Sequence, residues 1–318
     1  GIFIIRKRIF MVSRLLSSAF TSAPLLLSLA TLGWAGNTIA GRLAVGEVSP
    51  LVIVFMRWTI VFAILLMTKR KELPAALPKL KGKWPWVFMM GALGLSFFNT
   101  LFYIAAQSTT AINLGLIQCA MPMFILIGVT LILKTKLTFG QIIGTILTIA
   151  GVLLIISKGD FSLLVGLQIN EGDWIMLVAC IFYAGYTIGL QNRPDIDNMT
   201  MMTVFAGAAW VLSIPILLIE VTQGTAQWPA TQLAWLIVLF ISLIPSFMSQ
   251  VFYMRGVDLI GPDRAGVYSN LVPIYSAALG VLILNEAFGL YHFLSITIVI
   301  TGLTVISRSK PFENHVVN

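Results

Sequence analysis

Charge is the scarcest property of this sequence. Only 10% of its 318 residues are charged, against roughly 25% in a typical soluble domain, and the mean hydropathy is +0.96. Cysteine is also rare, and Cys119 and Cys180 both fall inside apolar runs, which excludes a framework of extracellular disulfides. The two histidines, His292 and His315, lack the spacing of metal ligands. We therefore expect a membrane protein with no metal and no cofactor.

Long apolar runs make up most of the chain. A spanning helix needs roughly 20 mostly apolar residues, and membrane barrels show a period of two that these runs lack. We predict an all-α integral membrane protein with short connections and no soluble domain. Its ten predicted transmembrane helices are at 24–44, 50–68, 84–107, 109–133, 139–157, 172–192, 199–220, 231–254, 262–284 and 289–307.

Basic residues indicate the orientation. Outside the spans, every Lys and Arg except Arg42 and Lys158 falls on one side of the predicted membrane. The positive-inside rule then places both termini in the cytoplasm, and we expect a bacterial inner membrane. The net charge of +8 reflects topology and contact with lipid, not nucleic-acid binding. Segment 1–19 is expected to be cytoplasmic. Its first ten residues are expected to be non-native or a short basic surface helix, because Met11 could be the native start.

The sequence repeats itself at an offset of about 150 residues. The landmarks keep their order and nearly constant spacing, so we predict two five-helix units at 20–157 and 172–307. An external linker at 158–171 joins them, and a cytoplasmic tail at 308–318 follows. The corresponding landmarks are Trp34–Ile39 with Tyr183–Ile188, Phe102 and Tyr103 with Phe252 and Tyr253, Pro122 with Pro273, Leu131–Leu133 with Leu282–Leu284, and Gly151 with Gly302.

Five helices are an odd number, so the second unit must enter the membrane from the opposite side. Inverted repeats around a central cavity are the plan by which secondary transporters place a site near the midplane and open it to either face in turn. The alternative is that the duplication forms only a pseudosymmetric scaffold. The plan favours transport.

The order of several short motifs carries a family resemblance. They are Trp34–Asn37, Pro50–Arg57, the prolines of the fourth and ninth spans, Leu284–Glu286, and Gly302 in the last span. Over residues 20–307 the chain resembles the drug/metabolite transporter superfamily, specifically its EamA-type ten-helix exporters, and within them the aromatic amino-acid exporter branch. The resemblance implies that spans 1, 3, 4, 6, 8 and 9 line the cavity and that spans 5 and 10 are peripheral. One departure is Thr135 or Lys136, which stands where an acidic residue like Glu286 is usual.

Neutral polar and aromatic side chains occupy the implied lining spans. Asn99, Tyr103 and Gln107 have the spacing of one helical face, and Ser246, Gln250 and Tyr253 repeat it in span 8. The alternative is that amides and small residues only bond helices together. Asn113 belongs to the same polar set. The predicted solute-binding residues are Trp34, Asn37, Asn99, Tyr103, Gln118, Tyr183, Tyr186, Gln250, Tyr253, Tyr268 and Asn270.

Ionisable residues are nearly absent from the spans. All twelve acidic residues map to loops or span ends, and only Arg57 lies clearly inside. Charge in a bilayer core is costly, so Arg57 either locks the fold through hydrogen bonds to carbonyls and contact with a ring, or contacts the solute. Pro122 and Pro273 are mid-span and are predicted as hinges, with ordinary packing kinks as the alternative.

A lining of amides, hydroxyls and rings suits a solute that carries both charges and an apolar or aromatic side chain. We predict a non-enzymatic exporter or facilitator of zwitterionic metabolites, above all amino acids. The solute is expected to move down its own gradient, because no titratable group that could couple transport to protons lies near the polar stripes. The alternatives are a proton-coupled drug/metabolite antiporter and a nucleotide-sugar or sugar-phosphate carrier. Expected partners are the solute and lipid, with a monomer or a weak homodimer. A glycine face at Gly140, Gly144 and Gly151 serves close packing or a dimer contact.

Overall fold

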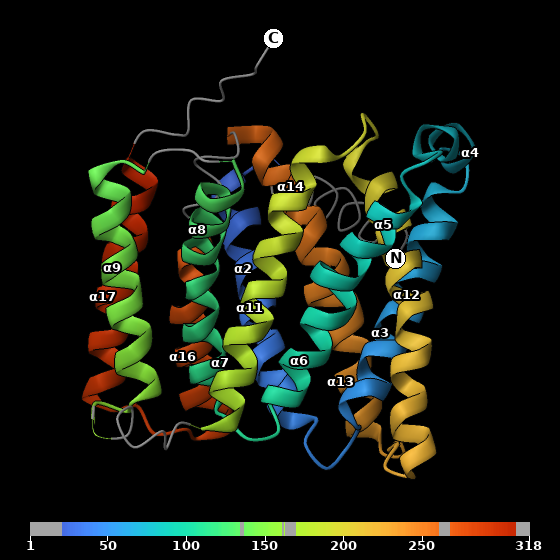
Figure 1. Cartoon of the computed structure of the whole chain (residues 1–318). Coiled ribbons are helices and arrows are strands. Elements are labelled where there is room, and N and C mark those ends of the chain that lie inside the picture. Colours follow the sequence, from blue (N-terminus) through green and yellow to red (C-terminus); the bar gives the residue numbers. More distant parts are fainter. Residues whose placement is uncertain (1–20, 134–136, 161, 163–169, 261–267, 310–318) are drawn as a thin grey trace, which may run out of the picture.

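The computed structural model describes residues 21–133, 137–160, 162, 170–260 and 268–309. Within these ranges the chain is a bundle of helices with no β-strand (Figure 1). Nine of the described helices are long and apolar enough to cross a membrane. A tenth apolar helical segment, Tyr268–Leu284, is shorter in its described part. The prediction of a ten-helix membrane protein is therefore confirmed.

The helix bounds agree closely with the apolar runs, but five of the described spans are built from two or three pieces. The first unit contains α2 (Ala23–Leu43), α3 (Pro50–Lys69), a short α4 (Leu73–Ala76) with η1 (Leu77–Leu80), then α5 (Trp84–Met90), η2 (Gly91–Phe97), α6 (Phe98–Ala105), α7 (Ala111–Ile117), η3 (Gln118–Ala120), α8 (Met121–Leu133) and α9 (Phe139–Ile156).

The second unit is built from pieces in the same way. It contains α11 (Glu171–Gly189), η4 (Leu190–Asn192), α12 (Asn198–Gln223), α13 (Gln232–Leu243), η5 (Ile244–Met248), α14 (Ser249–Ile260), η6 (Tyr268–Asn270), α16 (Leu271–Leu284) and α17 (Leu290–Arg308). The predicted span 262–284 begins before the described residues resume at 268. Segments 1–19 and 310–318 and the positions Thr135 and Lys136 lie outside the described residues.

Helix starts follow local sequence signals. Proline stands in the first turn of α2, α3 and α5, where its missing N–H would be unpaired anyway. Elsewhere a side-chain oxygen accepts from a first-turn N–H, which satisfies one of the unpaired donors of the helix start. These capping residues are Thr110 for α7, Thr138 for α9, Asn170 for α11, Asp197 for α12 and Thr231 for α13.

The packing of the helices has the symmetry expected of two copies. α2 of the first unit packs on α14 and α16 of the second, and its counterpart α11 packs on α6 and α8 of the first. α3 likewise packs on its counterpart α12. The helices implied to line a cavity are thus in mutual contact across the two units.

α9 and α17 form a separate pair at one edge of the bundle (Figure 1). A Cβ on Gly144 would lie 2.6 Å from the carbonyl oxygen of Gly302, and a Cβ on Gly302 would lie 2.7 Å from that of Gly144. Gly151 faces Val299 in the same way. The glycine face of span 5 therefore serves close packing within the chain, not a contact with a second copy.

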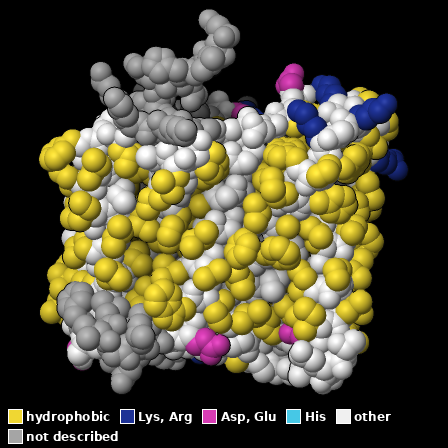
Figure 2. Space-filling model, in the orientation of Figure 1, with side chains coloured by type: hydrophobic (Ala, Val, Ile, Leu, Met, Phe, Trp, Pro, Cys, Tyr) yellow, Lys and Arg dark blue, Asp and Glu magenta, His cyan; other side chains and the backbone are white. Residues whose placement is uncertain are grey.

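The two ends of the bundle differ in charge. Lys and Arg side chains gather over the end that carries α4, and the flank between the ends is largely hydrophobic (Figure 2). We call this the basic end. The opposite end, called the far end, holds the connections at 44–49, 106–110, 224–231 and 285–289. α3, α7, α11, α13 and α17 all begin there.

Candidate functional site

A π-helical turn interrupts the same place in each unit. η2 covers Gly91–Phe97 and η5 covers Ile244–Met248, at nearly the same offset that relates Tyr103 to Tyr253. A π turn shifts the hydrogen-bond register by one residue, and such turns are frequent at functional sites. The sequence showed the repeat but not these turns.

An indole N–H binds the equivalent carbonyl in both π turns. Trp58 Nε1 donates to the carbonyl oxygen of Leu95 at 3.3 Å, and Trp34 Nε1 donates to that of Pro245 at 3.2 Å. Leu95 and Pro245 are 150 residues apart in the sequence. Each turn is therefore fixed by a tryptophan, through α3 in the first unit and through α2, from the other unit, in the second.

Aromatic rings from both units meet between the lining helices. The ring centroids of Trp34 and Tyr253 are 5.1 Å apart and tilted by 50°. On the α11 side, Tyr183 lies 5.6 Å from Tyr186 and 5.0 Å from Phe98. These separations are within the range in which aromatic pairs stabilise each other. Each of the five rings is half-buried, so part of its surface is not covered by the described residues.

Arg57 is the centre of a buried hydrogen-bond network. Its Nη1 donates to Asn99 Oδ1 at 2.6 Å and to the hydroxyl of Tyr103 at 2.8 Å. The Tyr103 hydroxyl donates in turn to Asn37 Oδ1 at 2.8 Å. The guanidinium carbon also lies 5.2 Å from the centroid of the Trp58 ring, within cation–π range. The network ties α3 to α6 and α2.

These contacts show that the polar stripe of span 3 bonds the helices together in this structure. Asn37, Asn99 and Tyr103 are 8%, 3% and 1% exposed, so they bind Arg57 and one another and present almost no surface. Their contact with the solute stays a prediction. Gln107, expected on the same face, lies beyond the end of α6 and is exposed, because the helix stops at Ala105.

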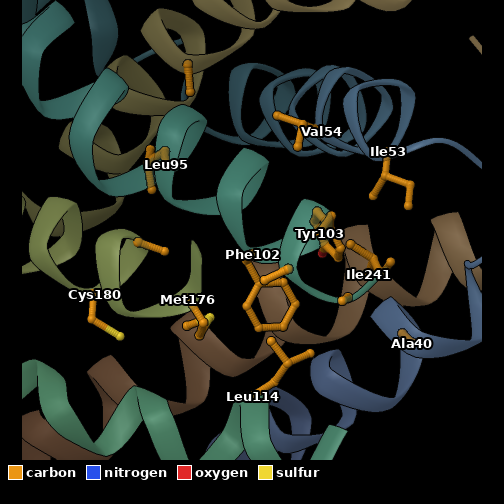
Figure 3. Close-up of a cluster of buried hydrophobic side chains, with 14 of the residues drawn as sticks. Ala40, Ile53, Val54, Leu95, Phe102, Tyr103, Leu114, Met176, Cys180 and Ile241 are labelled. Carbon is orange, nitrogen blue, oxygen red and sulfur yellow. The ribbon is translucent and has the colours of Figure 1, made fainter. Parts of the chain in front are cut away.

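Tyr103 also belongs to the hydrophobic core of the bundle. Figure 3 shows it beside Phe102, whose ring lies next to Leu114 of α7 and Met176 of α11. Cys180 is in the same cluster, and both cysteines are buried and free, so they pack in the core as small apolar side chains. The core therefore joins the two units on the far-end side of the Arg57 network.

The remaining candidates lie where spans 4 and 9 change helix type. Gln118 starts the 3₁₀ turn η3, where its Nε2 donates to the Leu114 carbonyl at 3.1 Å. Tyr268 and Asn270 begin and end the matching turn η6. Pro122 and Pro273 follow these turns, in the first turns of α8 and α16. Both spans thus pass from a 3₁₀ turn into an α-helix just before a proline, while the hinge role stays a prediction.

Two acidic residues of the far end cap helices that are distant from them in the sequence. Glu286 accepts hydrogen bonds from the backbone N–H groups of Ala111 at 2.7 Å and Ile112 at 3.0 Å, at the start of α7. Glu220 accepts from Ser49 Oγ at 2.5 Å and from the N–H of Leu51 at 3.2 Å, at the start of α3. A carboxylate is favoured there by the unpaired N–H groups and the helix dipole.

Asp173 is the ionisable residue that the sequence did not single out. It stands in the first turn of α11, a place where acidic residues are ordinarily solvated, yet it is fully buried. The hydroxyl of Thr109 donates a very short hydrogen bond to it, and Asn113 Nδ2 donates to both carboxylate oxygens at 3.2 Å. The expectation that no titratable group lies near the polar stripes did not concern span 4, where Asp173 binds Asn113.

A groove of about 510 Å³ opens at the basic end, between the start of α12 and the second half of α14. It is lined by Asp197, Asn198, Met199, Val251, Met254, Arg255 and Asp258. Burial acts to raise the pKa of Asp197, but hydrogen bonds from Thr200 and the charge of Lys69 outweigh it and hold that pKa below its usual range. The groove is consequently charged at its rim.

A family model matches the chain twice, over residues 21–157 and 170–308, and its description is the EamA-like transporter family. The chain belongs to the EamA-like transporter family. The family model thus matches the chain as two copies, and the resemblance to EamA-type transporters is confirmed, while the aromatic amino-acid exporter branch stays a prediction.

Relatives of this EamA-like chain are named as transporters. It is 25% identical to the uncharacterized transporter YetK of Bacillus subtilis, over 86% of this chain and 84% of YetK, and 23% identical to YyaM of the same organism, over 69% and 72%. It is 22% identical to a probable terminal-alkyne amino-acid exporter of Streptantibioticus cattleyicolor, over 64% and 66%.

A solved structure shares the fold of this EamA-like protein. The crystal structure of a protein aligns with a TM-score of 0.63 at 18% identity, over 91% of this chain and 99% of that one. At this identity the likeness shows the fold alone. Family, relatives and fold together identify a membrane transporter.

Proposed function

We propose that this transporter exports small zwitterionic metabolites, in the first place amino acids with aromatic side chains, by alternating access. The observation that carries the proposal is the Trp34–Tyr253 ring pair, which joins the two units beside the half-buried amide of Gln250. Rings can stack on an aromatic side chain or attract an ammonium, and amides can bond both charged groups of a zwitterion.

The electrostatics of the lining helices support a solute without net charge. Among the Lys and Arg residues of the described spans, Arg57 stands nearest the middle of its span, with Arg42 and Arg255 nearer the ends of theirs. Arg57 donates to two neutral side chains. The ion pairs found in the described part of the chain involve Lys69 at the basic end. A sugar-phosphate carrier would be expected to offer free Lys or Arg groups to a phosphate. The relative from Streptantibioticus cattleyicolor, named as an amino-acid exporter, supports the same class.

The proposal includes the setting of the protein. The basic end faces the cytoplasm by the positive-inside rule, in a bacterial inner membrane. The groove at Asp197 and Arg255 then opens to the cytoplasm, and the far end faces outward. Solute enters from the cytoplasm and leaves down its gradient. The protein acts as a monomer or a weak dimer, and it is not an enzyme.

Efflux from proteoliposomes tests the proposal. Vesicles loaded with labelled phenylalanine should release it faster with the protein than without it. Trp34→Ala and Tyr253→Ala should each slow release about three- to tenfold, the effect of losing a ring contact of about 0.5–1.5 kcal/mol. Trp235→Ala is the matched control, since that indole is 47% exposed on α13.

Two results would contradict the proposal. One is a folded protein, judged by circular dichroism, that moves no amino acid above the background of empty vesicles. The other concerns the driving force. If a pH gradient alone, with equal solute on both sides, produces accumulation, the gradient-driven mechanism is replaced by proton antiport.

A further inference from the structure

The far end is closed by contacts between the two units. The start of α11 packs so closely on the first unit that a Cβ on Gly172 would lie 2.6 Å from the carbonyl oxygen of Ala105. Asn170 Nδ2 donates to the carbonyl of Ser108 at 2.8 Å. Asp173 adds its bonds to Thr109 and Asn113. We call Asn170, Asp173, Thr109 and Asn113, with the Ser108 carbonyl, the far-end latch.

The latch joins helices that must separate if this end is to open. α11 belongs to the second unit, while α6, α7 and the turn between them belong to the first. A path to the far side between these helices requires the Asp173 bonds to break. The contacts between the units at the basic end are of another kind. Lys69 pairs with Asp197 at 3.5 Å and Lys79 Nζ donates to the Asp195 carbonyl at 2.7 Å, while the start of α2 meets α14 through Ala23, Leu27, Val257 and Ile260. The Asp197 side chain is 52% exposed, whereas Asp173 is fully buried.

The charge state of Asp173 decides how strong the latch is. An ionised carboxylate offers only acceptors, which match the hydroxyl of Thr109 and the amide of Asn113. A hydrogen bond to an ionised group is roughly twice as strong as a neutral one. Once a proton binds Oδ1, that oxygen can donate to the Thr109 hydroxyl, which accepts as well as donates, and Asn113 keeps Oδ2 as its acceptor. The bonds that remain are neutral, so the latch loses its charge-assisted hydrogen bonds and becomes weaker.

Among the described residues, no basic side chain forms an ion pair with Asp173 within 4.0 Å. Lys158 is near enough for its charge to act on Asp173, and the neutral Tyr291 also lies nearby. Glu171 precedes it on the same helix, and Glu286 caps α7 beside it. Residues 161 and 163–169 contain no titratable side chain. A proton is therefore the ion that changes this site.

We propose that Asp173 is a proton-binding site that controls the far-end latch. Ionised Asp173 holds α11 against the α6–α7 turn and keeps the far end closed, and its protonation releases the two units. Acid on the far side thus favours the state open to that side. This use of Asp173 goes beyond the proposed movement of amino acids, and the latch operates without a solute.

A thiol reporter measures the latch without any transport. In a protein with Cys119→Ala and Cys180→Ala, Leu114→Cys places a thiol in the buried cluster between α7 and α11. A membrane-impermeant maleimide is added on the far side of vesicles at several pH values between about 5 and 8. Labelling rates are compared with and without Asp173→Asn at each pH, so that the pH dependence of the thiol itself cancels.

The expected result is a ratio that depends on pH. At pH 8, Asp173→Asn should label at least about tenfold faster, the effect of losing a charge-assisted hydrogen bond. At pH 5 the ratio should approach one. Asp160→Asn, at an exposed carboxylate on the same end, is the control and should leave the rate at each pH unchanged.

Two outcomes would overturn the proposal. A ratio near one at every pH means that Asp173 does not hold the latch. A large ratio that does not vary with pH means that Asp173 holds it but senses no proton. If Asp173→Asn does not fold, Thr109→Val provides the second arm: it keeps the carboxylate, and faster labelling that still responds to pH is expected. These results do not depend on the solute, so they are separate from the efflux test.

Discussion

The indole nitrogen of Trp34 lies 3.2 Å from the carbonyl oxygen of Pro245, and the same indole ring faces Tyr253 two turns further along that span. One side chain of the first unit thus contacts both the π turn and the half-buried tyrosine of the second. The polar edge of Trp34 fixes the helix, and its face contributes to the aromatic site.

Trp34→Phe separates these two roles. The ring contact with Tyr253 remains, but the Pro245 carbonyl loses its donor, at a cost of about 1–3 kcal/mol for an unsatisfied buried group. We expect a lower melting temperature with phenylalanine efflux retained in the surviving protein. Trp174→Phe, at an indole that is 48% exposed on α11, should leave the melting temperature unchanged. Equal shifts in both proteins would contradict this role.

Tyr103→Phe tests the Arg57 network. The hydroxyl accepts from Arg57 and donates to Asn37, so its removal leaves both partners with an unmet bond and should lower the free energy of unfolding by about 1–3 kcal/mol. Thermal unfolding in detergent measures the loss. Tyr275→Phe on α16 is the control and should have little effect. If Tyr103→Phe melts like the parent protein, the network does not stabilise the fold.

Glu286→Ala should destabilise the start of α7. Two backbone N–H groups lose their acceptor, and the loss of a helix cap costs about 0.5–2 kcal/mol. The exposed Glu72, paired with Lys69 at 3.8 Å, is the matched control, because a surface ion pair contributes only about 0–1 kcal/mol. The expected order of melting temperatures is parent, then Glu72→Ala, then Glu286→Ala. The reverse order of the two variants would exclude a capping role.

Gly144→Ala and Gly302→Ala should disrupt the α9–α17 pair. Each new Cβ meets a backbone carbonyl at under 3.0 Å, and backbone cannot move aside without separating the helices. Yield of monodisperse protein by size-exclusion chromatography should fall in both. Gly185→Ala is the comparison, since its Cβ would meet only Leu93 Cδ1 at 3.5 Å. Normal yield of all three proteins would contradict the close packing.

The helices and the repeat could be predicted because both depend on composition over long stretches. Apolar runs of about 20 residues predict spans wherever they occur, and the landmark pairs from Trp34 with Tyr183 to Gly151 with Gly302 predict the two units. The pieces within a span could not be predicted. The π turn at Gly91–Phe97 has the same apolar pattern as an α-helix, and its register depends on the indole of Trp58 from another helix.

The burial of individual polar side chains could not be predicted from the sequence either. Asp173 and Glu220 both stand near span ends, where the sequence predicts solvated carboxylates, and both are buried by contacts with residues 60 or more positions away. Arg57 was recognised as unusual, but the expected partners were carbonyls. The actual partners are the side chains of Asn99 and Tyr103, which had been assigned to the solute. Such pairings depend on tertiary contacts that no local pattern records.

The pairing of α9 with α17 has a consequence for biosynthesis. The fifth helix leaves the ribosome and enters the membrane well before its partner, because the helices from α11 to α16 lie between them in the chain. Until translation ends, the glycine surface of α9 faces lipid or the insertion machinery. The first unit thus cannot complete its packing while it is being made, and a chain truncated before Leu290 should be recognised by membrane quality control as an unassembled helix.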